Sequence, residues 1–124
     1  MRNEIKIRFE EPEYEVNPEK GTVECFLRYE VLYPDFLQGV FFYGEKIYFF
    51  SKAIAKVNEG DVFDESIGKK ISLAKAEKKA YAKVRKRLIK KWSKIVGTLN
   101  VVGNFIDKAH DVVEHNDNYL EQWN

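Results

Sequence analysis

Cysteine, proline and long apolar segments are scarce in this chain. Its 124 residues include one cysteine and three prolines. A lone Cys25 excludes an intramolecular disulfide, and its place in a strand-like apolar run predicts a packed, unreactive thiol. No apolar stretch approaches the roughly 20 residues of a membrane-spanning helix, and the N-terminal ten residues alternate polar and apolar side chains without the apolar core of a signal peptide. We therefore expect a cytoplasmic protein.

Acidic residues are almost absent from residues 69–94. Twelve of the 21 basic residues lie there and Glu77 is the only acid, which gives this window a charge of +11, whereas the whole chain carries +1. The rest of the chain therefore carries about −10, and residues 1–36 alone hold nine acids against five bases. Such separation of charge favours binding to an acidic partner, foremost a nucleic-acid backbone.

Apolar residues make up 44% of the chain and aromatic residues 15%. This is enough to fill the core of one domain, so we expect residues 1–124 to form a single domain. Alternating apolar residues predict strands over residues 5–9 and 23–33. Residues 37–57 are rich in aromatic and β-branched side chains and contain a turn signal at Gly44, which suits two further strands. Residues 1–57 are thus predicted to form an antiparallel β-meander of about four strands.

Six aromatic residues gather in the last part of this region: Phe41, Phe42, Tyr43, Tyr48, Phe49 and Phe50. Aromatic side chains on a sheet can stack unpaired bases, but this group lacks the interleaved lysines and arginines that such a platform needs, and core packing against a helix is the better interpretation. Alternation places Tyr48, Phe50 and Ile54 on the face opposite Phe49. A row of side chains exposed on that face would be a candidate interface.

A long helix is predicted over residues 65–96, because no glycine or proline interrupts the chain between Lys69 and Val96. Asp61 or Asp64 is the expected N-cap. Gly97 is expected to end this helix.

Apolar spacing resumes after Gly97 and predicts a second, shorter helix over residues 98–115. Residues 116–124 then form an acidic, aromatic tail. The predicted fold class is α+β, an antiparallel sheet packed by one long basic helix and followed by a shorter C-terminal helix.

Helical spacing places apolar side chains on one side of the 65–96 helix and lysines on the other. The apolar side, expected to pack on the sheet, comprises Ile67, Ile71, Ala74, Tyr81, Val84, Leu88, Trp92 and Ile95. The basic side holds a column of lysines about 28 Å long at 1.5 Å per residue. The column and its neighbouring arginine comprise Lys75, Lys79, Lys83, Lys86, Arg87, Lys90 and Lys94. Since lysine contacts phosphates without reading bases, we predict that these seven residues bind nucleic acid through its backbone.

Residues with metal-ligand chemistry occur together at His110, Asp111, Glu114 and His115. On a helix they would face two directions, and their spacing fits neither of the zinc motifs HExxH and HxxEH. The chain also has no phosphate-binding glycine loop and no GxSxG nucleophile motif. We therefore expect no metal, no cofactor and no enzymatic activity.

Residues 55–76 carry a motif in which a strand ending in Ala-Lys leads through a polar turn to D-x-F-D, a glycine and a helix. Asp61, Phe63, Asp64 and Gly68 occupy its central positions. This stretch resembles a motif of small, mostly uncharacterised bacteriophage proteins. It departs from that pattern at Val57 and Glu59, where the family often has cysteine and proline. The expected roles are structural: an aspartate caps the helix, Phe63 anchors the turn and Gly68 allows close approach to the sheet.

The resemblance implies a phage protein that acts in the host cell, of the kind that inhibits host nucleic-acid-targeting machinery, as anti-CRISPR and other antidefence proteins do. Together with the basic helix, it predicts a small non-enzymatic protein that contacts DNA or RNA, alone or within a host nucleoprotein. Two alternatives stay open. One is an inhibitor that grips an acidic host protein surface or docks its own acidic tail on a basic one. The other is a structural module that assembles head to tail through its oppositely charged segments.

Overall fold

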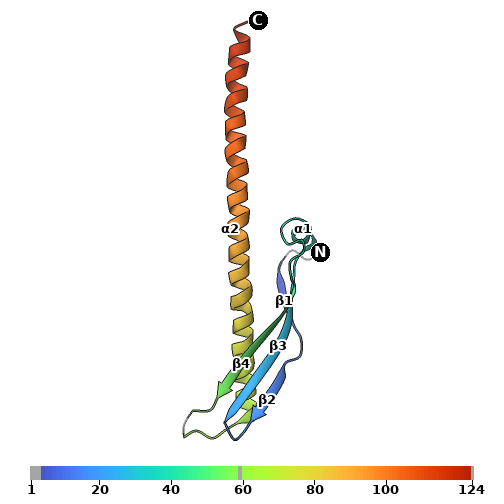
Figure 1. The fold of residues 1–124 in the computed structure, drawn as a ribbon, viewed down its shortest axis with the longest axis vertical. Coiled ribbons are helices and arrows are strands. Elements are labelled where there is room, and N and C mark those ends of the chain that lie inside the picture. The colour runs from blue at the N-terminus through green and yellow to red at the C-terminus, as the bar shows by residue number, and fades with distance from the viewer. Residues whose placement is uncertain (1–3, 59, 124) are drawn as a thin grey trace. The chain divides into compact units, whose positions relative to one another are not determined.

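The computed structural model describes residues 4–58 and 60–123 and confirms the α+β fold class (Figure 1). An antiparallel four-stranded sheet precedes a long helix. The elements are β1 (Lys6–Phe9), β2 (Glu13–Asn17), β3 (Thr22–Leu32), α1 (Asp35–Gln38), β4 (Tyr48–Lys56) and α2 (Glu65–Glu121). Where we expected a single domain, the chain divides into two compact units, Met1–Lys86 and Arg87–Asn124, and α2 contributes to both.

Strand β3 is the centre of the sheet. Along one of its edges, β3 pairs with β2 over residues 22–26 and with β1 over residues 29–32. Its other edge pairs with β4. This arrangement differs from the predicted β-meander, because β1 and β2 do not pair with each other. They form two halves of one edge strand, and the segment between them contains Pro12, which has no N–H group for a sheet ladder.

The predicted number of strands is confirmed, but one predicted strand is wrong. Residues 37–44 form no strand, because Pro34 starts the helical turn of α1: its carbonyl accepts hydrogen bonds from the N–H groups of Leu37 (2.9 Å) and Gln38 (3.1 Å). The additional strand is β2, whose inward-facing apolar residues are only Tyr14 and Val16. Two alternating residues are too few to predict a strand from sequence.

The core of the first unit lies between β3 and α2. As predicted, one face of β3 is buried along its whole length, and the burial continues to Tyr33 directly after the strand: Val23, Cys25, Leu27, Tyr29, Val31 and Tyr33. Ala53 and Ala55 of β4 extend this layer. The hydroxyl of Ser51 donates a hydrogen bond of 2.8 Å to the backbone carbonyl of Ala76, which ties β4 directly to α2.

The side of α2 that packs on the sheet is not the predicted one. Of the eight expected residues only Val84 is buried, while large side chains such as Ile67, Ile71 and Tyr81 are exposed. A stripe of mostly small residues at four-residue intervals faces the sheet instead, and we call it the small-residue stripe: Gly68, Ser72, Ala76, Ala80 and Val84. Small side chains occupy the face in contact with the sheet because they let the helix backbone come close to β3.

Helix α2 approaches β3 closely at Gly68, as the place of this residue in the motif predicted. A Cβ atom added there would lie 2.6 Å from Cγ2 of the buried Val23, whereas one added at Gly97 would meet nothing within 4 Å. We expect Gly68→Ala to lower the free energy of unfolding by about 1 kcal/mol, since crowding outweighs the gain in helix propensity. The matched change Gly97→Ala should stabilise the helix by up to about 1 kcal/mol. Thermal unfolding followed by circular dichroism measures both changes, and equal stabilisation by the two would contradict the close packing.

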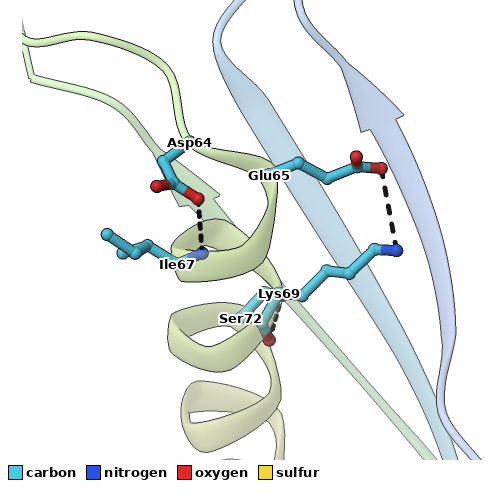
Figure 2. Close-up of polar contacts among 5 residues, drawn as sticks. All are labelled: Asp64, Glu65, Ile67, Lys69 and Ser72. Atoms are coloured by element: carbon cyan, nitrogen blue, oxygen red, sulfur yellow. Dashed lines mark hydrogen bonds and ion pairs between the residues drawn. The ribbon is translucent and has the colours of Figure 1, made fainter.

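The N-terminus of α2 is capped by Asp64, one of the two predicted candidates. Its Oδ1 atom accepts a hydrogen bond of 3.1 Å from the N–H of Ile67 (Figure 2). In the next turn Lys69 forms an ion pair with Glu65 at 3.6 Å. Asp61 instead belongs to the preceding turn, where its N–H donates to the carbonyl of Asn58 at 3.0 Å.

The predicted end of the helix at Gly97 is wrong. Helix α2 continues through Gly97 and Gly103 to Glu121, so the separate helix over residues 98–115 does not exist, and most of the predicted tail over residues 116–124 is helical. A glycine inside a helix costs only about 1 kcal/mol relative to alanine and no proline follows, which explains why the helix is not broken. The second unit therefore consists of helix almost throughout.

Candidate nucleic-acid interface

The predicted lysines are exposed on α2 in both units. The first unit holds Lys75, Lys79, Lys83 and Lys86, and the second holds Lys90 and Lys94, with Arg87 half-buried at its start. None of these six lysines takes part in an ion pair with any residue in the described ranges 4–58 and 60–123. Their positive charge is thus available to a partner.

Two of these lysines are anchored at the edge of the sheet. The Nζ atom of Lys75 donates to the carbonyl of Ile54 at 3.3 Å, and that of Lys79 donates to the carbonyl of Lys52 at 3.0 Å. Both carbonyls belong to β4, on the edge that does not pair with β3. Each ammonium group has three donors, so each lysine keeps two for a bound anion. The bonds also cover part of an otherwise open strand edge.

Strand β4 adds two lysines that the sequence analysis missed. Lys52 and Lys56 alternate with the buried residues of β4, and their side chains are therefore exposed on the face of the sheet turned away from α2. Together with Lys75 and Lys79 they form what we call the β4 basic edge. The alternation of Lys52 and Lys56 with small apolar residues was the signal in the sequence. It was overlooked because the charge of the basic helix dominates the composition.

Aromatic side chains occupy the same outward face of β4. Tyr48 is 64% exposed and Phe50 49% exposed, and Ile54 follows on the same row, as the alternation predicted. The Phe50 ring stacks on Phe26 of β3 with the ring centroids 6.1 Å apart. We call Tyr48, Phe50 and Phe26 the aromatic platform.

The expectation that the aromatic residues pack mainly in the core is therefore wrong for most of them. Four of the six are exposed: Phe41, Tyr43, Tyr48 and Phe50. Phe42 and Phe49 are half-buried, and the ring of Phe42 stacks on that of Tyr33 with the ring centroids 4.2 Å apart. For Tyr48 and Phe50 the absence of α2 from this face explains the difference, whereas Phe41 and Tyr43 lie in the loop between α1 and β4, outside the sheet.

Basic residues are interleaved with the aromatic platform, contrary to the sequence analysis. The cross-strand register sets Arg28 opposite Phe50 and Phe26 opposite Lys52. Arg28 contacts Glu13 of β2 at 4.0 Å through an exposed ion pair, which contributes little to stability. Acidic residues of the same face lie on β2 and β3: Glu15 pairs in register with Glu24, and Glu24 and Glu30 lie opposite Ile54 and Tyr48 of β4. The basic residues Lys52 and Lys56 of β4 therefore border an acidic part of the sheet.

The remaining motif residues surround a hollow of about 370 Å³ at the start of α2. Phe63 is half-buried against it, and Asp61, Asp64 and Gly68 line its rim. Asp64 and Gly68 have the predicted roles of capping and close packing, whereas Asp61 does not cap α2.

Cys25 is fully buried, as its place in the strand predicted. Burial, with a smaller contribution from the Glu77 carboxylate, raises the pKa of its thiol. Burial also raises the pKa of the neighbouring Tyr14 hydroxyl, with smaller contributions from Cys25 and Glu77. A raised pKa favours the protonated form, so neither the Cys25 thiol nor the Tyr14 hydroxyl is activated as a nucleophile.

The raised thiol pKa predicts a loss of stability at alkaline pH. Above about pH 8.5 the thiol ionises in the unfolded chain but stays protonated in the folded protein, so the free energy of unfolding falls as the pH rises. Urea unfolding at pH 7.5 and pH 9.5 should show this fall in the wild type, and a smaller one in Cys25→Ala. An identical fall in both proteins would contradict the assignment to Cys25.

Metal-ligand residues do not converge in the described part of the chain, where no group of three or more histidine, cysteine, aspartate or glutamate side chains is placed to hold a metal ion. His110 and Glu114 contact each other at 3.7 Å along one face of α2. Across residues 4–58 and 60–123, no helix combines the length and apolarity needed to cross a membrane.

Comparisons of the chain with protein-family models, with curated proteins and with solved structures find no match.

Proposed function

We propose that the protein binds single-stranded nucleic acid on the outward face of β3 and β4. Unpaired bases stack on the aromatic platform, and the phosphates contact the β4 basic edge. One observation supports this proposal above all: basic and aromatic side chains lie together along β4. The strand itself holds Lys52 and Lys56 beside Tyr48 and Phe50. Helix α2 adds Lys75 and Lys79, which donate hydrogen bonds to carbonyls at the edge of β4.

Single strands fit this surface better than duplexes. Exposed aromatic rings stack on bases only where the bases are free of a partner strand, and each stacked base contributes about 1–3 kcal/mol. Lysine contributes a point charge without the planar fork that reads base edges, so the binding is expected to be tolerant of sequence. No step of this function requires bond making or breaking, and we propose a binding protein rather than an enzyme. The resemblance to phage proteins favours a target within a host nucleic-acid system.

Fluorescence anisotropy with three labelled ligands tests the proposal: a single strand, a hairpin RNA and a duplex DNA, each over a salt series. We expect the single strand to bind at least about tenfold more tightly than the duplex. With four phosphate contacts, log K should fall against log salt with a slope of about −3. Equal binding of duplex and single strand would remove the role of the aromatic platform, and no binding at low salt would refute the proposal.

Aromatic substitutions separate stacking from charge. Tyr48→Ala with Phe50→Ala should weaken single-strand binding by at least tenfold and leave the salt slope unchanged, because the lysines that neutralise the phosphates are all retained. The matched control is Tyr43→Ala, since Tyr43 is also exposed but lies outside the sheet. Weakening of the same size in the control would contradict stacking on β4.

A further inference from the structure

The second unit presents a continuous apolar seam along α2. From Leu88 to Trp123 its positions follow one another at alternating intervals of four and three residues. The seam comprises Leu88, Trp92, Ile95, Leu99, Val102, Ile106, Ala109, Val113, Asn116, Leu120 and Trp123. Ten of these eleven residues are apolar, and Trp92, Leu99, Val102, Ile106 and Val113 are exposed. The spacing is that of a heptad repeat sustained over about five heptads.

A heptad seam of this length points to another helix as its partner. Successive seam positions average 3.5 residues, which keeps the apolar side chains facing a neighbouring helix along their whole length. A patch that only contacts a globular surface has no need of such regular spacing. The glycine at position 97 lies outside the seam, so it does not interrupt the contact surface.

The charges of the same segment indicate which helix it is. Residues 87–94 carry four basic side chains and no acid, for a charge of +4. Residues 107–121 carry five acids and Lys108, for a charge of −4. Two copies in parallel would set like charges against each other, whereas two antiparallel copies set each basic block against the acidic block of its partner.

We propose that residues 88–121, the part of the seam that lies within α2, form an antiparallel helix pair with a second copy of this chain. The interface is the same surface on both copies and is closed by a two-fold axis, so it forms a dimer and not a filament. Asn116 is the one polar residue of the seam, and a buried amide restricts the registers that the pair can adopt. The interface uses no residue of the β4 basic edge, and this proposal stands independently of the proposed function.

Adjacent valines give a matched test. Val102 lies in the seam and Val101 lies beside it, and both are exposed in the single chain (50% and 70%). Sedimentation equilibrium of the full chain should give twice the single-chain mass of 14.6 kDa. Val102→Asn should raise the dissociation constant at least about tenfold, because it buries an amide in both copies, while Val101→Asn should leave it unchanged. A monomeric wild type, or an equal response of the two variants, would overturn the proposal.

Charge changes test the orientation of the pair. Lys90→Glu with Lys94→Glu should weaken the dimer at least about tenfold at low salt. Two-fold antiparallel pairing of the seam sets these lysines near Glu121 and Asp117 of the other copy, so adding Asp117→Lys with Glu121→Lys in the same chain should restore the dimer. Raising the salt concentration should weaken the wild-type dimer, since salt screens the attraction between the blocks. A dimer that tightens with salt, or that tightens on the lysine changes, would be parallel and would overturn the antiparallel arrangement.

Discussion

Ala76→Leu is expected to lower the free energy of unfolding of the first unit by about 3 kcal/mol. Ala76 is fully buried in one cluster with Cys25, Leu27 and Ala53, and its carbonyl accepts the hydrogen bond from Ser51. Three additional carbon atoms have no space between α2 and β3, so the helix must move away from the sheet. Overpacking of this kind typically costs 1–3 kcal/mol, and a disturbed buried hydrogen bond adds about 1 kcal/mol. Urea unfolding followed by circular dichroism measures the change.

Ala82→Leu is the matched control, because Ala82 is exposed on the same helix. Alanine and leucine have similar helix propensities, and the control should change the stability by less than about 0.5 kcal/mol. If Ala76→Leu were equally well tolerated, the small-residue stripe would not be the packing face of α2.

Reversing two charges of the β4 basic edge is expected to weaken single-strand binding about 100-fold at low salt. Lys52→Glu with Lys56→Glu leaves two phosphates without their lysines and places two carboxylates beside the remaining phosphates. The salt slope should become less negative by about 1.4, or 0.7 for each phosphate that is no longer neutralised. Anisotropy titrations of the wild type and the variant over the same salt series measure both quantities. Both side chains are exposed on the face turned away from α2, so the fold should be retained.

Lys78→Glu with Arg85→Glu changes the net charge by the same amount at another place. Helical spacing puts both residues on the side of α2 turned away from the small-residue stripe. This control should weaken binding only a few-fold, through the long-range field. Equal weakening in the two double variants would mean that net charge governs binding and that β4 has no special part in it.

Two elements of the first unit could be predicted, because each has a regular sequence pattern. The alternation from Val23 to Tyr33 identified β3 and its buried face, and Asp64 followed by a long run without glycine or proline identified the start of α2. The packing face of α2 was missed because large apolar residues were assumed to be buried. Small residues recur every four positions along α2: Gly68, Ser72, Ala76 and Ala80. They let the helix approach β3 closely, and this determines which side of α2 faces the sheet.

The candidate interface could be predicted only in part. The density of lysines on α2 is visible in the sequence, but Lys75 and Lys79 meet β4 through hydrogen bonds to backbone carbonyls, which no residue pattern records. The exposure of Tyr48 and Phe50 depends on which face of the sheet α2 covers. The expected helix end at Gly97 divided the apolar spacing into two helices. The heptad seam could therefore not be recognised as one continuous surface, although α2 continues through Gly97.

Lysine protection by a bound single strand tests the proposed function most directly. The protein is acetylated briefly with and without the strand, and the extent of modification at each lysine is measured by mass spectrometry. We predict protection at Lys52, Lys56, Lys75 and Lys79, with Lys20 and Lys78 unchanged. Protection confined to the outer side of α2, or spread evenly over all lysines, would contradict binding at β4.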